Sequence, residues 1–486
     1  MQRKFISNLV LLVFLNLLVK PFYILGIDTE FIIRLGQSSY GSYFALLNLS
    51  ILMNIFLDFG IVNFNTGTIA RNEILLNKHF KHIMGLRMAL AGIYVLITLL
   101  LGLVLGYGQG SLYLLLLLCL NQVLAGFILY LRSNLAGLQL YAQDSLISVL
   151  DRLVLIGTCS YVLWFGPNDL KLSVELFVYL QTAAYVLALM AGLFLVIRKV
   201  GFKGISLKLP FSLLILKKSF PYALLVLLMG FYYRTDGVML ERMLDDGPYQ
   251  AGIYAQAFRF YEAGNMLALL FSTLLFPMFS RLLGQKKNVQ PLLELSFKIL
   301  TCGAIFASCI GFFQAVEIMD LRYDTEIQAS SQAFKYLMFG FFSLAGTYIF
   351  GALLTANQSL RALNTMAMIG VFLNIGLNLL LIPTHKAEGA AFASMVTQIL
   401  MAIYQVVLVR KEMDIHISGA SWLKMAIYAL VLILSFSLLK ALGFHWITIS
   451  VSNFFIGLAA AFGLKLISVN QAIRFFQLRK QLVERF

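Results

Sequence analysis

Residues 220–281 read FPYALLVLLMGFYYRTDGVMLERMLDDGPYQAGIYAQAFRFYEAGNMLALLFSTLLFPMFSR, two membrane-length apolar runs joined by a short polar turn. Inside these runs lie Arg234, Asp236, Arg259 and Glu262. A charged side chain at membrane depth is costly unless it pairs with another group or faces a water-filled cavity. The sequence therefore predicts a transmembrane helical hairpin whose charges pair or serve a function.

The two arginines of this hairpin are expected at similar depth. A helix that enters the membrane at Phe220 carries Arg234 roughly 21 Å along its axis. A helix that returns from about Ala251 carries Arg259 roughly 12 Å below the opposite surface. Because the hydrocarbon core is about 30 Å thick, both guanidinium groups reach one level of the membrane.

The spacing of the acidic residues predicts how the charges pair. Arg234 and Asp236 point about 200° apart on one helix and cannot meet face to face. Arg259 and Glu262 stand three residues apart and can form an ion pair. Asp236 is therefore expected to reach the neighbouring helix, with Arg259 as its predicted partner. A permanent salt-bridge network that only locks the helices remains the structural alternative.

The composition indicates that membrane-spanning helices make up most of the chain. Hydrophobic residues make up 60% of the 486 positions and charged residues 12%, whereas a soluble domain carries about a quarter charged residues. About fourteen apolar segments have the length of a membrane span. The first segment, 6–27, contains Lys20 and Pro21. It is expected to be retained as a span, not cleaved as a signal peptide. The sequence predicts an all-α polytopic membrane protein.

The net charge of +15 reflects membrane topology. Most Lys and Arg residues fall in the connections on the side of the N-terminus, which places both termini in the cytoplasm. We therefore expect no nucleic-acid partner. The four cysteines lie within apolar runs and predict neither disulfides nor a metal site. Without a nucleotide-binding loop, direct use of ATP is not expected. We predict no enzymatic activity and no cofactor.

Four parts are predicted along the chain. They are an N-terminal bundle of six helices at 1–200, a basic cytoplasmic linker at 201–218, a C-terminal bundle of six helices at 219–410, and helices 13 and 14 with a basic cytoplasmic tail at 411–486. The two bundles share a similar three-residue motif, Gly41-Ser-Tyr43 in the first and Gly252-Ile-Tyr254 in the second. Each motif stands at the start of the second span of its bundle. Paired bundles of this kind place a substrate site between the repeats near the midplane.

Six short segments carry a resemblance to a known family. They are Gly36–Tyr43, Tyr233–Asp236, Ala251–Tyr254, Phe276–Arg281, Asn378–Pro383 and Gly389–Ala391. In these segments, and in hydropathy over nearly its whole length, the chain resembles the polysaccharide flippases. They form the Wzx-type branch of the multidrug, oligosaccharidyl-lipid and polysaccharide (MOP) exporter superfamily.

The resemblance implies two pseudo-symmetric six-helix bundles, two added helices and alternating access to a central cavity in the bacterial cytoplasmic membrane. The implied cargo is an undecaprenyl-diphosphate-linked oligosaccharide moved from the inner to the outer leaflet for O-antigen, lipopolysaccharide, capsule or exopolysaccharide biosynthesis. Glycan polymerases and glycosyltransferases are further partners left open. The chain departs from the lipid II flippases in having few basic residues in its first two spans.

The same resemblance implies the site residues. Cationic side chains in the cavities of family members are matched here by Lys20, Arg234 and Arg259. The planar fork of arginine suits phosphate oxygens, so these residues are expected to bind the diphosphate. The acidic residues either pair with the cations when no cargo is bound or take part in coupling to H⁺ or Na⁺. They are Asp236, Glu262 and Asp58.

Two other functions stay open. A multidrug or cation antiporter of the same superfamily would bind cationic drugs, which favour acidic residues without accompanying arginines. A membrane-embedded glycan polymerase or ligase would bring its substrate to a substantial outer loop. The longest outer connection here, about 320–331, is short and contains no histidine.

Overall fold

The computed structural model describes residues 18–62, 65–66, 69, 74–138, 140–166, 171–200 and 204–467. Every regular element in these ranges is a helix, which confirms the predicted all-α class. Eleven of the described helices are long and apolar enough to cross a membrane. The count of fourteen remains a prediction, and most of the predicted first span, 6–27, lies outside the described residues. The basic tail also lies outside them.

Contacts divide the chain into two compact units, Met1–Ala255 and Gln256–Phe486. The division falls after the predicted linker because α10 (Leu209–Met243) packs against α3 (Gln37–Leu52) and so joins the first unit. The four-part organisation predicted from the sequence remains a prediction.

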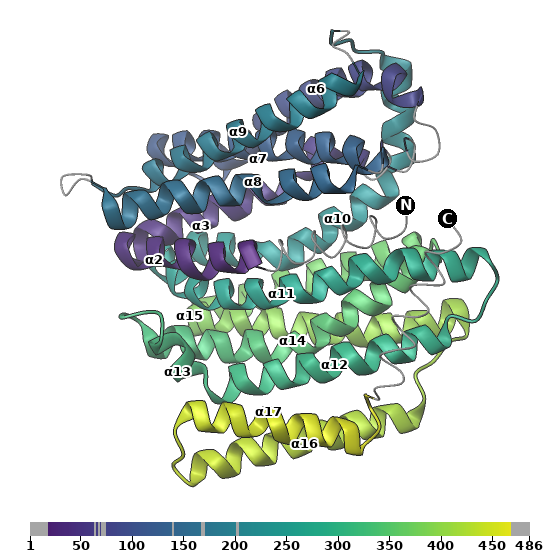
Figure 1. Cartoon of the computed structure of the whole chain (residues 1–486). Coiled ribbons are helices and arrows are strands. Elements are labelled where there is room, and N and C mark those ends of the chain that lie inside the picture. Colours follow the sequence, from purple (N-terminus) through teal and green to yellow (C-terminus); the bar gives the residue numbers. More distant parts are fainter. Residues whose placement is uncertain are drawn as a thin grey trace. The chain divides into compact units, whose positions relative to one another are not determined.

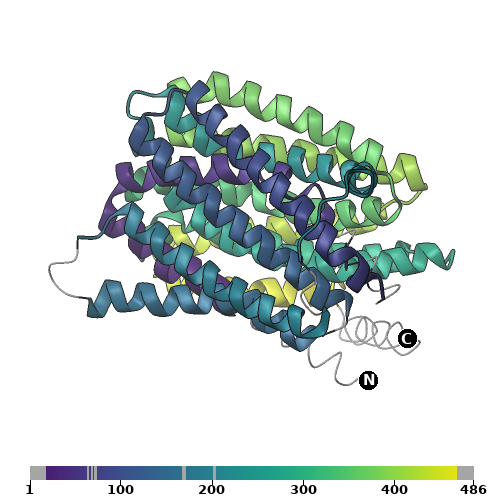
Figure 2. The same ribbon diagram turned by 90° about the horizontal axis from the view of Figure 1, so that it is seen from above.

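The first unit is built from α3, α10 and eight further helical elements. They are η1 (Tyr23–Asp28), α2 (Thr29–Leu35), α4 (Ile55–Asp58), α6 (Ile74–Val104), α7 (Gln109–Gly137), α8 (Tyr141–Ser160), η2 (Tyr161–Phe165) and α9 (Val174–Val200). Helices α6, α7, α8 and α9 run side by side (Figures 1 and 2), with α7 in contact with the other three. Large apolar side chains such as Leu96 and Leu187 remain exposed on these helices. Such a surface matches hydrocarbon and is unfavourable in water.

The end of α10 is tied to the turn between α6 and α7. Tyr107 donates its hydroxyl to Glu241 Oε2 at 2.8 Å. Arg242 donates to the Leu105 carbonyl at 2.9 Å, and its guanidinium lies 4.2 Å from the centre of the Tyr107 ring. These contacts explain why α10 belongs with the first unit.

The remaining helices are α11 (Gly247–Gly284), which begins in the first unit, and six that lie wholly in the second. These six are α12 (Gln290–Phe313), α13 (Ala315–Asp320), α14 (Ile327–Ala356), α15 (Leu360–Met413), α16 (Gly419–Ala441) and α17 (Trp446–Gly463). Helix α14 contacts both α12 and α15, and most of it is buried. Helices α16 and α17 pack on each other and on α12, with most of their residues facing outward. The sequence predicts these two helices as an addition to twelve spans, and that count remains a prediction.

Helix α15 has 54 residues, enough for two membrane spans, and a sharp bend divides it into two arms. The bend lies at Lys386, where φ is 50° and ψ is −131°. Pro383 lacks the N–H that a continuing helix needs. A Cβ at Gly389 would lie 2.5 Å from the Leu381 carbonyl oxygen, so only glycine allows the two arms to come this close. The Gly389–Ala391 motif therefore has a packing role.

The topology can be tested with single cysteines at two exposed positions that flank α12. Lys287 precedes this helix and Asp324 follows α13, so the two positions lie at opposite ends of one predicted span. Because the basic connections are expected in the cytoplasm, a membrane-impermeant thiol reagent should label Asp324→Cys in intact cells and leave Lys287→Cys unlabelled until lysis. Labelling of Lys287→Cys from outside would invert the topology.

Candidate functional site

The contact between α3 and α10 positions the first predicted site residue. Gly237 lets the two helices approach closely, since a Cβ there would lie 2.6 Å from Asn48 Nδ2 and 2.8 Å from Phe44 Cε1. Beside this contact, Arg234 donates a hydrogen bond to Asn48 Oδ1 at 3.3 Å. Asn48 is itself buried. Arg234 is therefore held by an amide from a helix that the sequence analysis did not connect to it.

Asp236 reaches a neighbouring helix, as expected from its position on α10. It is 1% exposed, and its Oδ2 accepts a hydrogen bond of 2.8 Å from the Tyr254 hydroxyl at the start of α11. The Tyr254 ring packs near Phe44, with ring centres 6.3 Å apart. The predicted pairing of Asp236 with Arg259 remains a prediction.

The two echoed glycines pack at one place in the first unit. A Cβ at Gly41 would lie 1.8 Å from the Pro248 carbonyl oxygen, and one at Gly252 would lie 2.2 Å from the Gln37 carbonyl oxygen. The backbones at the starts of α3 and α11 therefore touch. No side chain fits between them without displacing a helix. This close contact explains why glycine stands at the first position of both motifs.

In the second unit, Arg259 and Glu262 form the ion pair that their spacing predicts. Arg259 Nη1 lies 2.7 Å from Glu262 Oε2, and the two side chains are 6% and 14% exposed. One residue away, Tyr261 donates to Gln398 Oε1 on α15 at 2.8 Å. Removing one partner of a buried pair typically costs about 3–5 kcal/mol, because the other charge is left uncompensated.

Arg152, which the sequence analysis did not assign to the site, lies against aromatic rings. Its guanidinium is 4.6 Å from the centre of the Tyr23 ring and 5.8 Å from that of Tyr185, within the range of cation–π attraction. Its Nε lies 3.6 Å from Asp151 Oδ2. Arg152 stands near the start of an apolar run, and hydropathy locates such a start only to within a few residues. The helix that carries it begins earlier, at Tyr141.

Lys20 lies close enough to Arg132, Arg152 and Asp151 to interact with them electrostatically. Arg132 pairs with Asp144, its Nε 2.7 Å from Oδ1. Three cations and two carboxylates leave one positive charge in excess, which makes this cluster attractive to an anion. Within the described part of the chain, no ion pair or hydrogen bond joins the Lys20 ammonium to another residue. We call these five residues the Lys20 cluster.

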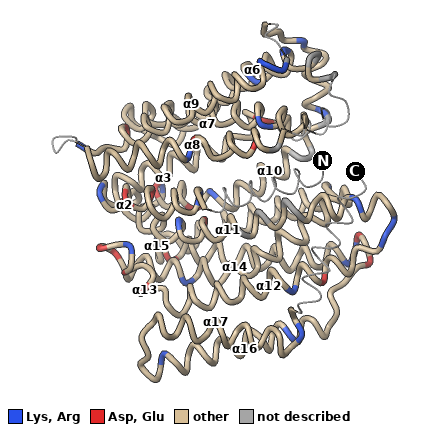
Figure 3. The backbone as a smooth tube through the Cα atoms, in the orientation of Figure 1, with Lys and Arg blue, Asp and Glu red and all other residues tan. Residues whose placement is uncertain are grey.

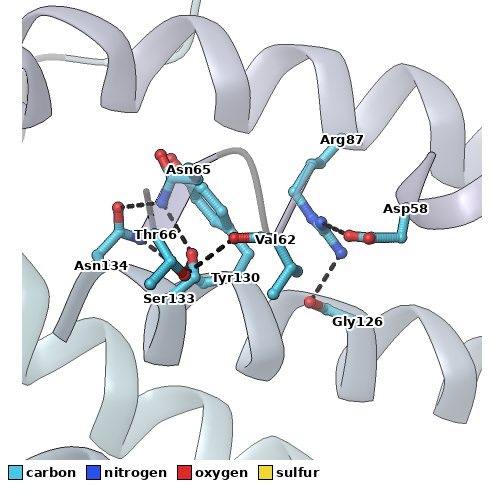
Figure 4. Close-up of polar contacts among 9 residues, drawn as sticks. All are labelled: Asp58, Val62, Asn65, Thr66, Arg87, Gly126, Tyr130, Ser133 and Asn134. Atoms are coloured by element: carbon cyan, nitrogen blue, oxygen red, sulfur yellow. Dashed lines mark hydrogen bonds and ion pairs between the residues drawn. The ribbon is translucent and has the colours of Figure 1, made fainter. Parts of the chain in front are cut away.

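Asp58 is joined to Arg87, a pairing that the sequence did not reveal (Figure 4). The Arg87 side chain is fully buried and also donates to the Gly126 carbonyl at 2.8 Å. Its guanidinium lies 5.5 Å from the centre of the Tyr130 ring. Because Asp58 compensates a fully buried cation, its role in this structure is charge pairing.

Figure 4 also shows a second polar network, in which Asn65 donates to Ser133 Oγ at 2.8 Å and to Asn134 Oδ1 at 2.9 Å. All three residues are nearly fully buried.

Figure 3 shows Lys, Arg, Asp and Glu mainly at the helix ends and connections, so the charges within helices stand out as exceptions. In the described ranges, no cluster of His, Cys, Asp and Glu could hold a metal ion.

Two family profiles match the sequence. One, described as "Polysaccharide biosynthesis protein", matches residues 29–283, more than half of the chain. The other, described as "Lipid II flippase MurJ", matches residues 248–460. Among curated protein sequences, none matches at a significant level.

Several solved transporter structures have a similar fold. A structure of lipid II flippase MurJ in an inward closed conformation gives a TM-score of 0.73 at 13% identity, covering 94% of this chain and 97% of that chain. The Vibrio cholerae MATE transporter VcmN, as a point mutant, gives 0.56 at 15% identity, covering 85% and 98%. A MOP superfamily transporter from Pyrococcus furiosus gives 0.56 at 13% identity, covering 85% and 96%. At these identities the likeness concerns the fold alone.

The glycine contact yields a stability test. Alanine at Gly41 or Gly252 forces a backbone shift, and overpacking of this kind typically costs about 1–3 kcal/mol. We expect each variant to unfold at a lower temperature than the wild type in detergent. Gly92→Ala on α6 is the matched control, because no heavy atom lies within 4 Å of the added Cβ. Equal unfolding temperatures for all three variants would contradict the close contact.

Proposed function

Because the chain belongs to the polysaccharide biosynthesis protein family, within the MOP exporter superfamily, we propose that it is a flippase for an undecaprenyl-diphosphate-linked oligosaccharide. The cargo would move from the inner to the outer leaflet of the bacterial cytoplasmic membrane for O-antigen, capsule or exopolysaccharide biosynthesis. The match to the lipid II flippase profile supports a lipid-linked cargo. The observation that carries the proposal is the presence of buried or half-buried cations within membrane-length helices of both units.

A diphosphate is the part of this cargo that costs most to bring into the membrane. Guanidinium groups compensate it well, because each offers parallel N–H donors to two phosphate oxygens. Arg234 is oriented by the neutral Asn48 amide, and Arg259 is paired with Glu262. In the proposed mechanism, phosphate oxygens replace the Glu262 carboxylate on Arg259. Lys20 belongs to a cluster with excess positive charge and would attract the headgroup.

The proposed coupling role falls on two of the three acidic residues. Asp58 already compensates Arg87, so releasing it for a coupling ion would leave a fully buried cation alone. Asp236 accepts a hydrogen bond from a neutral hydroxyl, and Glu262 would be released when cargo takes Arg259. We therefore assign coupling to H⁺ or Na⁺ to Asp236 and Glu262.

A multidrug or cation antiporter is the second candidate, because MATE transporters share the fold. The excess positive charge of the Lys20 cluster disfavours it, since like charges repel a cationic drug. A glycan polymerase or ligase lacks comparable support, as the described connection from α13 to α14 spans only residues 321–326.

The cargo-binding role of the arginines predicts a graded loss of transport. Lysine at Arg234 or Arg259 keeps the charge and loses the bidentate geometry, so it should retain partial activity, whereas alanine should reduce transport more than about tenfold. Translocation of the lipid-linked oligosaccharide is measured in proteoliposomes and normalised to inserted protein.

Arg361→Ala provides the control for these variants, because Arg361 is exposed at the start of α15. Its transport should match the wild type. Near-normal transport by well-inserted Arg234→Ala and Arg259→Ala proteins would leave these arginines with structural roles only.

The predicted pairing of Asp236 with Arg259 can be tested with a double-mutant cycle, in which the two losses of stability should not add. Asp236→Asn should destabilise the protein because Arg259 keeps only Glu262 as a carboxylate partner, and Arg259→Gln should destabilise it because Glu262 and Asp236 both lose a cation. Breaking a buried pair typically costs about 3–5 kcal/mol. The double variant should lose less than the sum of the two single losses. Additive losses in thermal unfolding would argue against the pairing.

A further inference from the structure

The second unit contains a cavity with a volume of about 320 Å³. It lies where α12, α14 and the last turns of α15 meet the connection to α16. Its wall is mainly apolar and includes Leu293, Phe350 and Val406. Its polar groups are Arg410 and His416. The cavity therefore combines an apolar wall with a cationic side chain, and none of the proposed cargo-binding residues contributes to it.

Arg410 is available to a ligand. It lies in the last turn of α15, it is exposed, and its guanidinium forms no ion pair or hydrogen bond within the described residues. His416 is also exposed, and its carbonyl is fixed by a hydrogen bond of 3.1 Å from Gln290 Nε2. The connection that carries His416 is thus held in place, and among the described residues no carboxylate forms an ion pair with Arg410.

The surroundings of the cavity are those of a membrane boundary. Trp422 lines the cavity and is 44% exposed, and tryptophan is enriched at the interface between hydrocarbon and water. Its neighbour Leu423 is 63% exposed, and Val407, next to the lining residue Val406, is 54% exposed. The cavity thus adjoins apolar side chains that face outward from two membrane-length helices. An occupant that uses the whole cavity has an anionic end and an apolar end.

We propose that this cavity binds an anionic phospholipid of the surrounding membrane. The phosphate accepts hydrogen bonds from Arg410, and part of an acyl chain lies against the apolar wall. A guanidinium suits phosphate oxygens better than a point charge does. The volume falls at the lower end of the range of about 300–1,000 Å³ that is typical of ligand pockets, enough for part of one chain. Free phosphate would leave the apolar wall unfilled.

This lipid joins α15 to the connection that leads into α16. We therefore expect it to stabilise the attachment of α16 and α17, the pair whose residues are least buried. The inference is independent of the cargo and of the direction of transport. Its test measures lipid binding, so its outcome is separable from that of the flippase proposal.

The test uses purified full-length protein, delipidated in detergent and titrated with phosphatidylglycerol or phosphatidylcholine. Native mass spectrometry counts the bound lipids. Wild type should retain one phosphatidylglycerol more tightly than phosphatidylcholine. Arg410→Gln should weaken this binding about tenfold, because one charge-assisted contact is lost. Lys411→Gln is the matched control, since Lys411 is also exposed in the last turn of α15 and does not line the cavity.

A second pair of variants tests the apolar wall while leaving the charges unchanged. Val406→Phe should fill the cavity and lower phosphatidylglycerol binding, whereas Val407→Phe adds the same volume on the outward-facing side and should not. Equal effects of Arg410→Gln and Lys411→Gln on phosphatidylglycerol binding would show that general surface charge, and not this cavity, attracts the lipid. That result would overturn the proposal. Equal effects of the two phenylalanine variants would also overturn it, as would full competition by inorganic phosphate.

Discussion

A charge buried in hydrocarbon must have a partner, and much of this structure follows from that constraint. Arg87 is fully buried and has a carboxylate, a carbonyl and aromatic rings around it. Arg259 has Glu262, and Asp236 has the Tyr254 hydroxyl. Because an unpaired buried charge is more costly than a paired one, these contacts restrict which helices can be neighbours and at what register.

The same environment explains why glycines, and not large apolar residues, mark the closest helix contacts. Lipid tails are as apolar as leucine, so helices in a membrane associate through close packing and polar contacts more than through burial of apolar surface. Gly41, Gly237 and Gly252 each allow a neighbouring chain to approach to a distance that a Cβ would prevent. Two of these glycines contact carbonyl oxygens, and the third brings α10 against the amide that holds Arg234. Close packing and charge placement are thus coupled in the first unit.

The sequence predicts the fold class and the local pairs well, because both depend on short-range patterns. Long apolar runs predict membrane helices, and a spacing of three residues predicts the contact of Arg259 with Glu262. The partner of Asp58 lies 29 residues away on another helix, and no local pattern predicts such a contact. Hydropathy locates the boundary of a span only to within a few residues, so it does not show whether Arg132 and Arg152 belong to membrane helices. The helices extend past those boundaries and bring both arginines to Lys20.

The different partners of the cations also bear on how the proposed cargo would drive a conformational change. A ligand shifts an equilibrium only by the difference between its affinities for the two states. Lys20 has only weaker electrostatic neighbours, so a phosphate near it displaces no ion pair. At Arg259 a phosphate must replace Glu262, which releases a carboxylate whose side chain is only 14% exposed. A released carboxylate there is unfavourable until it takes up a proton or a cation. In the proposed mechanism, cargo binding at Arg259 therefore requires ion uptake at Glu262, whereas cargo attraction at Lys20 does not.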